Sequence, residues 1–140
     1  MIILDSDHIS IFQRGTSPNA VRLRTRMWAE SRQCCASIVS LEEQMKGWLA
    51  AINRQRDVRL QVDAYARLQN MFSVFSHWVI LPWTDEAAEL FVQLRQTKIR
   101  VPTMDLKIAC IAITNDALLL TRNTVDFEKV PRLKFEDWLA

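Results

Sequence analysis

The sequence predicts an α/β fold, a three-layer α/β/α sandwich with a central, mostly parallel sheet. Three observations indicate it. Short, continuously apolar runs recur along the chain, which is typical of strands buried on both faces. Segments with helical periodicity separate these runs, so helices would connect parallel strands and cover both faces of the sheet. No Pro-, Gly- or Ser-rich linker divides the 140 residues, which predicts one domain over residues 1–140.

The first half of the chain begins with an apolar run at residues 2–4, too short for a helix and ended by Asp5. A helix follows to about Arg14, where Gly15 marks a turn. We expect a second helix over residues 19–31, capped by Asn19. Residues 34–38 then form another apolar run and predict the second strand.

Ser40 is expected to begin the next helix, and residues 57–76 predict a longer one. An apolar stripe runs along this second helix, which indicates a face packed in the core. Its members recur every three or four residues: Val58, Val62, Tyr65, Leu68, Phe72 and Phe75.

The second half of the chain alternates in the same way. Residues 78–81 predict a third strand and residues 118–120 a fourth, with a short edge strand at 133–135. Between the third and fourth strands, Thr84 is expected to cap one helix and Thr103 another.

The composition excludes several classes of protein. With 49% hydrophobic and 24% charged residues, the chain is neither disordered nor low in complexity. The longest apolar runs, such as residues 108–113, are far too short for a membrane span, and no basic leader precedes the first apolar residues. The three cysteines (Cys34, Cys35 and Cys110) are expected to be reduced, buried thiols. A cytoplasmic protein is therefore predicted.

The charge balance leaves the partner open, because 18 basic and 16 acidic residues give a net charge of +2. Residues 1–59 carry nine basic and six acidic residues, a net of +3, whereas the remainder has a net of −1. Two arginine clusters lie in the first part. Either could contact phosphates or simply form a solvated helix face: Arg22, Arg24 and Arg26, and Arg54, Arg56 and Arg59.

Acidic residues follow several of the predicted strands. Ligands bind at the carboxyl ends of parallel strands, so we expect these side chains to share one crevice. Gathered carboxylates repel one another unless a cation neutralises them, and an oxygen-only cluster suits Mg²⁺ or Mn²⁺. Such a site would support hydrolysis of a phosphodiester bond. The candidates are Asp5, Asp7, Glu42, Glu43, Asp105 and Asp126.

Each acid also has a structural interpretation. Ser40-Leu-Glu-Glu43 matches a capping box, and Asp105 would be favoured in the first turn of any helix. Asp7 could cap a helix and Asp126 could form a turn. The two histidines, His8 and His77, are expected to have structural roles, and no Gly-rich phosphate loop is present.

Four segments together resemble the motifs of PIN-domain ribonucleases, specifically the VapC-type toxins of bacterial toxin–antitoxin pairs. Residues 2–10 (IILDSDHIS) are similar to the opening strand, and residues 37–47 (SIVSLEEQMKG) to the second motif. Residues 101–112 (VPTMDLKIACIA) resemble the third motif, and residues 119–127 (LLTRNTVDF) the last. The four occur in order and span nearly the whole chain.

The resemblance implies a PIN-like fold and a Mg²⁺-dependent endoribonuclease (Mn²⁺ possible) that acts on RNA. It further implies a homodimer and a cognate VapB-like antitoxin. Asp5, Glu43 and Asp105 would hold the metal, and Glu43 is selected over Glu42 because it precedes a Gly by four residues. The other implied site residues are Asn123 and Asp126 in the catalytic shell, and Thr121 and Arg122 in substrate binding.

Two positions depart from the family pattern. Asp7 stands where many members have Asn, and Asn123 stands where many have an acid. Because Asn123 supplies only a neutral oxygen, one ion rather than two is expected, with Asp126 as a substitute ligand.

Two alternatives remain. The first is a PIN-fold module that binds RNA or a partner without catalysis. The second is a haloacid-dehalogenase-type phosphatase, because Asp5-Ser-Asp7 resembles the Asp-x-Asp motif of that family. Ile9 fits the family pattern poorly.

Overall fold

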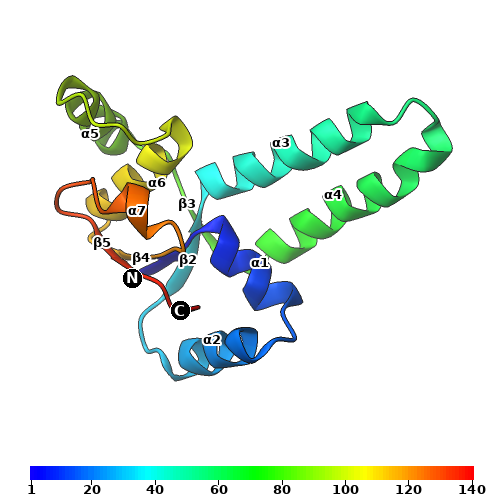
Figure 1. Cartoon of the computed structure of the whole chain (residues 1–140), viewed down its shortest axis with the longest axis horizontal. Coiled ribbons are helices and arrows are strands. Elements are labelled where there is room, and N and C mark those ends of the chain that lie inside the picture. The colour runs from blue at the N-terminus through cyan, green and yellow to red at the C-terminus, as the bar shows by residue number, and fades with distance from the viewer.

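Five short parallel strands form one central sheet in the computed structural model, which describes residues 1–140 (Figure 1). The spatial order is β3-β2-β1-β4-β5, and every neighbouring pair is parallel. Ile2 of β1 pairs with Cys34 on one side and Leu118 on the other. The strands are β1 (Ile2–Leu4), β2 (Cys34–Ser37), β3 (Val79–Leu81), β4 (Leu118–Leu120) and β5 (Lys134–Glu136).

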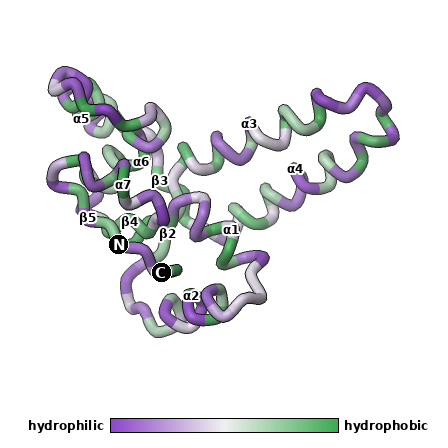
Figure 2. The backbone as a smooth tube through the Cα atoms, viewed as in Figure 1, coloured by the Kyte–Doolittle hydropathy of each residue, from purple (hydrophilic) through white to green (hydrophobic).

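Seven α-helices and one 3₁₀ helix connect the strands. Helices α3 and α4 run side by side and project from the body of the molecule as an arm (Figure 1). The turn at the end of this arm is hydrophilic (Figure 2). The helices are α1 (Ser6–Arg14), α2 (Pro18–Ala29), α3 (Ile38–Arg54), the 3₁₀ helix η1 (Val58–Gln61), α4 (Val62–Phe75), α5 (Asp85–Gln96), α6 (Thr103–Thr114) and α7 (Thr124–Phe127).

The sheet has a buried core on each face, because alternate residues of a strand point to opposite sides. Ile3 packs with the apolar side chains of α5 and α6, including Leu90 and Ile108. Ile2 and Leu4 pack on the other face with α1, α2 and the base of α4. The predicted three-layer α/β/α sandwich is therefore confirmed, and its sheet is parallel throughout.

Several predicted helix caps are wrong by one to three residues. Ser17, not Asn19, caps α2 with its Oγ, which leaves Pro18 at the first helical position. Ser37, not Ser40, caps α3 by accepting a hydrogen bond from the Ser40 amide at 3.1 Å. Thr103 does not cap α6 but is its first residue. The Thr84 cap of α5 is confirmed, since its Oγ1 accepts from Ala87 at 3.1 Å.

The prediction that the stripe on residues 57–76 is core is wrong for most of its members. Four members are each at least half exposed: Val58, Val62, Tyr65 and Phe72. Phe75 is buried and packs on the face of the sheet that α1 and α2 cover. The stripe has the period of a buried helix, but the arm extends past the edge of the sheet. Only the base of α4 reaches the core of the body, and the rest of α4 packs against α3.

The three cysteines are free thiols, as predicted, and Cys34 is half-buried rather than buried. Burial raises the pKa of the Cys110 thiol to about 11. None of the helices combines the length and the apolar character needed to cross a lipid bilayer.

Candidate active site

The acidic residues meet where β1, β2 and β4 end. Asp5 directly follows β1, Glu43 lies near the start of α3 after β2, and Asn123 and Asp126 follow β4. Asp105 reaches the same place from the first turn of α6. Because β2, β1 and β4 are adjacent and parallel, their carboxyl ends lie together, which brings residues far apart in sequence to one edge of the sheet.

Asp5 is the most buried of these carboxylates, with 7% of its surface exposed. Its Oδ1 accepts a hydrogen bond from the Ser6 amide at 2.8 Å, so Asp5 is also the cap of α1. Its Oδ2 accepts from the Thr121 hydroxyl at 2.9 Å. Burial raises the pKa of Asp5 to about 6, and the negative charge of Asp7 contributes to the same shift.

Glu43 faces the same crevice, and its Oε1 is buried without a hydrogen-bond partner. Burial raises its pKa to about 7, and the charges of Asp5 and Asp105 add to the effect. Glu42 points away into solvent and pairs with Lys46 at 3.0 Å. The capping-box interpretation of Glu43 is wrong, because Ser37 takes the place of Ser40 as the cap.

Asn123 lies between two carboxylates. Its Nδ2 donates to Asp126 Oδ2 at 3.0 Å and to Asp105 Oδ2 at 3.3 Å. Burial raises the pKa of Asp105, and the nearby charge of Asp126 acts in the same direction. The hydrogen bonds from Asn123 and Lys129 instead lower the pKa of Asp126. The neutral amide therefore separates two acids that would otherwise repel.

Thr121 and Arg122 both use their polar groups to hold the site together. Thr121 is fully buried. Its hydroxyl donates to Asp5, and its Oγ1 accepts a hydrogen bond from the backbone amide of Asn123 at 3.1 Å. The backbone amide of Arg122 donates to Asp7 Oδ2 at 3.0 Å. The Asp126 carboxylate forms its ion pair with Lys129 at 3.3 Å and not with Arg122. Substrate binding by Thr121 and Arg122 stays a prediction.

Asp7 and His8 form a support that the sequence did not reveal. His8 is fully buried; its Nδ1 lies 2.7 Å from Asp7 Oδ1, and its Nε2 accepts from the Trp138 amide at 3.2 Å. These partners require the tautomer with a proton on Nδ1, which donates to Asp7. The expected structural role of His8 is confirmed. Asp7 is not a helix cap; it links α1 to the segment after β4.

The donor set fits a divalent cation that prefers oxygen. The three candidate ligands, Asp5, Glu43 and Asp105, all have raised pKa values, and Glu43 offers a buried oxygen with no partner. As they stand, no three ligand side chains converge closely enough to hold one ion directly.

The chain is similar to proteins named ribonuclease VapC, and no family model matches it. It is 27% identical over 137 residues to Ribonuclease VapC of Rickettsia bellii, covering 95% of this chain and 92% of the relative. It is 23% identical over 138 residues to Ribonuclease VapC1 of Haemophilus influenzae, covering 99% and 98%.

Solved structures share the fold over almost the entire chain. Similar chains occur in VapBC2 of Rickettsia felis bound to a promoter DNA fragment (TM-score 0.71, 19% identity, 99% of both chains covered). They also occur in DNA-bound VapBC of Salmonella typhimurium (TM-score 0.71, 21% identity, 99% of both chains covered). The resemblance to VapC-type toxins is thus confirmed: the chain is a homologue of proteins named ribonuclease VapC and has the PIN-like fold of chains in VapBC structures.

Proposed function

We propose that this protein is a metal-dependent endoribonuclease that hydrolyses RNA phosphodiester bonds and acts as the toxin of a toxin–antitoxin pair. One observation carries the proposal. Asp5, Glu43 and Asp105 come from three separate elements and gather at the carboxyl edge of the sheet, where each has a raised pKa. A bound cation would relieve the repulsion among these carboxylates, and the homologues named ribonuclease VapC support the reaction class.

Asp5 and Asp105 would hold the ion, with Glu43 bound to it directly or through water. A bound Mg²⁺, or Mn²⁺ with the same preference for oxygen, supplies a Lewis acid for the phosphate and a lower pKa for the attacking water. The surrounding residues keep the ligands in place. Thr121 fixes Oδ2 of Asp5, and Asn123 fixes Asp105 beside Asp126.

We further propose an antitoxin partner, a homodimer and a cytoplasmic location. The similar solved structures named VapBC support the first of these. Exposed apolar side chains on the arm, including Tyr65 and Phe72, give a partner protein surface to cover. Light scattering tests the dimer: a particle of twice 16.3 kDa is expected, and a particle of 16.3 kDa would contradict it.

RNA cleavage tests the proposed activity. We expect cleavage in Mg²⁺ by the wild-type protein and by Asp116→Asn, whose exposed carboxylate is paired with Lys134 away from the site. EDTA, Asp5→Asn and Asp105→Asn should each reduce the rate by at least about 100-fold, the order expected when an essential electrostatic group is lost. Equal cleavage by all samples would overturn the proposal and indicate a contaminant.

A PIN-fold module that binds RNA without cutting it is the second candidate. It is favoured by the neutral Asn123 and by the separation of the carboxylates, which do not converge on one point. Tight RNA binding that persists in EDTA, with no cleavage in Mg²⁺ or Mn²⁺, would support this candidate over the nuclease.

A further inference from the structure

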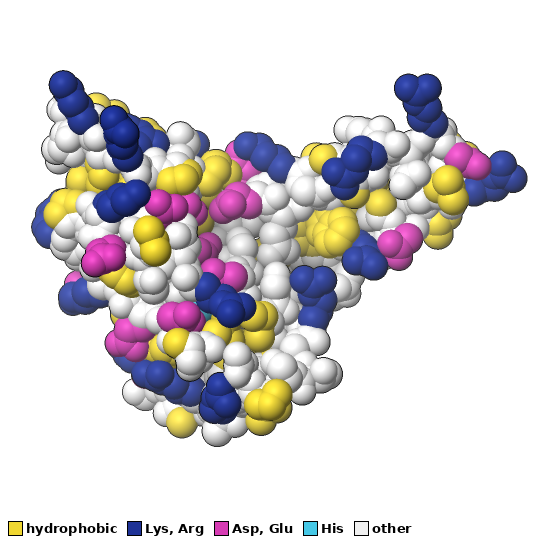
Figure 3. Space-filling view, viewed as in Figure 1, with side chains coloured by type: hydrophobic (Ala, Val, Ile, Leu, Met, Phe, Trp, Pro, Cys, Tyr) yellow, Lys and Arg dark blue, Asp and Glu magenta, His cyan; other side chains and the backbone are white.

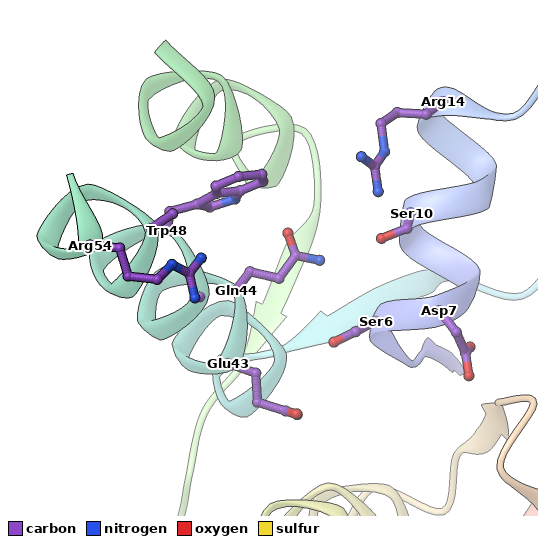
Figure 4. A pocket seen from close by; sticks show the side chains of 10 residues that line it. Ser6, Asp7, Ser10, Arg14, Glu43, Gln44, Trp48 and Arg54 are labelled. Atoms are coloured by element: carbon purple, nitrogen blue, oxygen red, sulfur yellow. The ribbon is translucent and has the colours of Figure 1, made fainter. Parts of the chain in front are cut away.

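A polar groove with a volume of about 470 Å³ runs between α1 and α3, beside the acidic site (Figure 4). Its inner end contains Asp7 and Glu43. From there it extends along both helices toward their carboxyl ends. The groove is also lined by Ser6, Ser10, Arg14, Gln44, Trp48 and Arg54.

Two arginines line this groove from opposite helices. Arg14 lies in the last turn of α1 and Arg54 in the last turn of α3; Figure 4 shows Arg14 pointing from α1 toward α3, and Arg54 lying along α3. Neither forms an ion pair with a carboxylate of the chain. Their charges are therefore free to bind an anionic ligand, and a guanidinium binds phosphate oxygens in bidentate fashion.

An aromatic ring lies between these charges. Trp48 is half-buried on α3 and faces the groove (Figure 4). A second hollow of about 610 Å³ shares Ser10, Arg14, Gln44 and Trp48 with the first and continues to Arg67 on α4. The Arg67 guanidinium lies 5.5 Å from the centre of the Trp48 ring. Basic groups and one aromatic surface thus follow a single path, and basic side chains flank the hollow between the body and the arm (Figure 3).

The inner end of the groove contains two buried oxygens that no group of the protein satisfies. They are Ser6 Oγ and Glu43 Oε1, and both residues line the groove. A buried polar atom without a partner costs about 1–3 kcal/mol, so its presence beside a cavity indicates a ligand. The Ser6 hydroxyl can donate to an oxygen of that ligand, directly next to the proposed metal ligands.

The lining of the groove favours a nucleic-acid strand over a protein helix. Seven of the ten lining residues carry polar or charged side chains, and the two arginines without a carboxylate partner offer positive charge for phosphate groups. Proteins that bind single strands combine basic grooves with exposed aromatic rings on which unpaired bases stack.

We propose that this groove holds a single strand of RNA that leads into the acidic site, with Arg14 and Arg54 binding backbone phosphates and Trp48 stacking on an unpaired base. The identity of the strand as RNA rests on the proposed ribonuclease function. Ser6 and Arg14 are eight residues apart on one helix, a distance of about 12 Å, or three to four nucleotides of a stacked strand.

Binding of a labelled single-stranded RNA of about 12 nucleotides, within the site sizes known for such grooves, tests the proposal by fluorescence anisotropy in EDTA. Arg14→Ala and Arg54→Ala should each weaken binding and reduce the slope of log K against log salt by about 0.7, the value for one lost phosphate contact. Trp48→Ala should weaken binding by about 10- to 100-fold, and Trp48→Phe by less because it keeps a ring.

Arg56→Ala is the matched control, since Arg56 is exposed on the same arm and does not line the groove. Equal losses in Arg56→Ala and Arg54→Ala would overturn the proposal in favour of general charge attraction. Unchanged RNA binding by both groove arginine variants would overturn it too. A poly-glutamate peptide that binds more tightly than RNA, and that loses affinity in the same variants, would assign the groove to an acidic protein segment instead.

The two proposals fail in different ways. The binding assay contains no divalent ion, so a wild-type protein that binds RNA through Arg14, Trp48 and Arg54 but never cleaves it would contradict only the nuclease. A protein that cleaves in Mg²⁺, with groove variants as active and as tightly bound as wild type, would contradict only the groove.

Discussion

Asp5 shows how one side chain can be held firmly and still be unstable in its charged form. The Ser6 amide and the Thr121 hydroxyl both donate to it, and both contacts lower its pKa. Burial and the charge of Asp7 outweigh them, and the pKa rises from 3.8 to about 6. A shift of this size corresponds to about 3 kcal/mol of destabilisation once the carboxylate is ionised.

Asp5→Asn is therefore expected to stabilise the metal-free protein near pH 7.5. Between about pH 4 and pH 6 the folded protein keeps a proton on Asp5 that the unfolded chain has released. The free energy of unfolding thus falls as the pH rises through this window. Asn cannot ionise, and we expect a gain of about 1–2 kcal/mol at pH 7.5, since the amide replaces only part of the hydrogen bonding.

Thermal unfolding in EDTA at pH 3.5 and pH 7.5 checks this prediction. The advantage of Asp5→Asn should shrink toward zero at pH 3.5, where Asp5 is protonated in the folded protein and mostly protonated in the unfolded chain. A variant that is less stable than wild type at both pH values would show that the hydrogen bonds, and not the charge, dominate at this position.

Asn123 is the second residue whose side chain determines the charge of the site. Its amide donates to Asp105 and Asp126, so the protein separates two acids without needing a cation between them. Asn123→Asp would keep the cap of α7, because Asp is also a favourable cap, but it would place a third negative charge between the other two.

We expect Asn123→Asp to lower the stability in EDTA by about 1–2 kcal/mol, as like charges at short range do. The same change should tighten Mg²⁺ binding by about tenfold, because a carboxylate is a stronger ligand than an amide oxygen. Calorimetric titration with Mg²⁺ measures the affinity, and Asn123→Ala is the control that removes the amide without adding charge. Equal Mg²⁺ affinity in all three proteins would place Asn123 outside the metal site.

At the scale of elements, local sequence patterns predicted which segments form strands and helices, but not which of their faces are buried. Four strands were predictable because continuously apolar runs have few alternatives in a chain of this length. The edge strand β5 (Lys134–Glu136) has only one apolar residue, and its prediction at residues 133–135 was off by one residue. The cap of α3 was not, since Ser37 and Ser40 are both good caps and only the extended backbone at Ser37 decides between them. The period of α4 indicated a helix correctly, but tertiary placement left most of its apolar face exposed.

The two glycines of the chain predict opposite stability effects. Gly47 lies within α3, and a Cβ there would meet nothing within 4 Å. Gly47→Ala should stabilise the protein by up to about 1 kcal/mol through higher helix propensity. A Cβ on Gly15 would collide with the Ala20 side chain and the Ile11 carbonyl oxygen, where α1 turns into α2.

Gly15→Ala should therefore destabilise the protein by about 2 kcal/mol or more, in the range of overpacked cores. Denaturant unfolding of both variants measures the two effects. If Gly47→Ala is instead destabilising, α3 is not a continuous helix through the arm.

At the scale of the whole molecule, the sequence could indicate the acids but not the groove beside them. The motifs around Asp5, Glu43 and Asp105 each lie on one segment, so local resemblance was enough to find them. Arg14 and Trp48 carry no motif. They come together only because the chain reverses between α1 and α3, and that juxtaposition follows from the packing of the entire domain.

A bound cation would connect distant parts of the chain, because Asp5 follows β1, Glu43 lies on α3 and Asp105 lies on α6. It would also relieve the repulsion that adds to burial in raising their pKa values, so Mg²⁺ should stabilise the folded state as a whole. At 100 times its Kd, a ligand that binds only the folded state adds about 2.7 kcal/mol, which raises Tm by about 10 °C in a domain of this size. Differential scanning fluorimetry with and without Mg²⁺, at matched ionic strength, measures the shift. Asp105→Asn should lose most of it, whereas Asp116→Asn, which changes an exposed acid paired with Lys134, should retain it in full. An equal rise in Tm for both variants would mean that Mg²⁺ acts on the general surface and not at the carboxyl edge of the sheet.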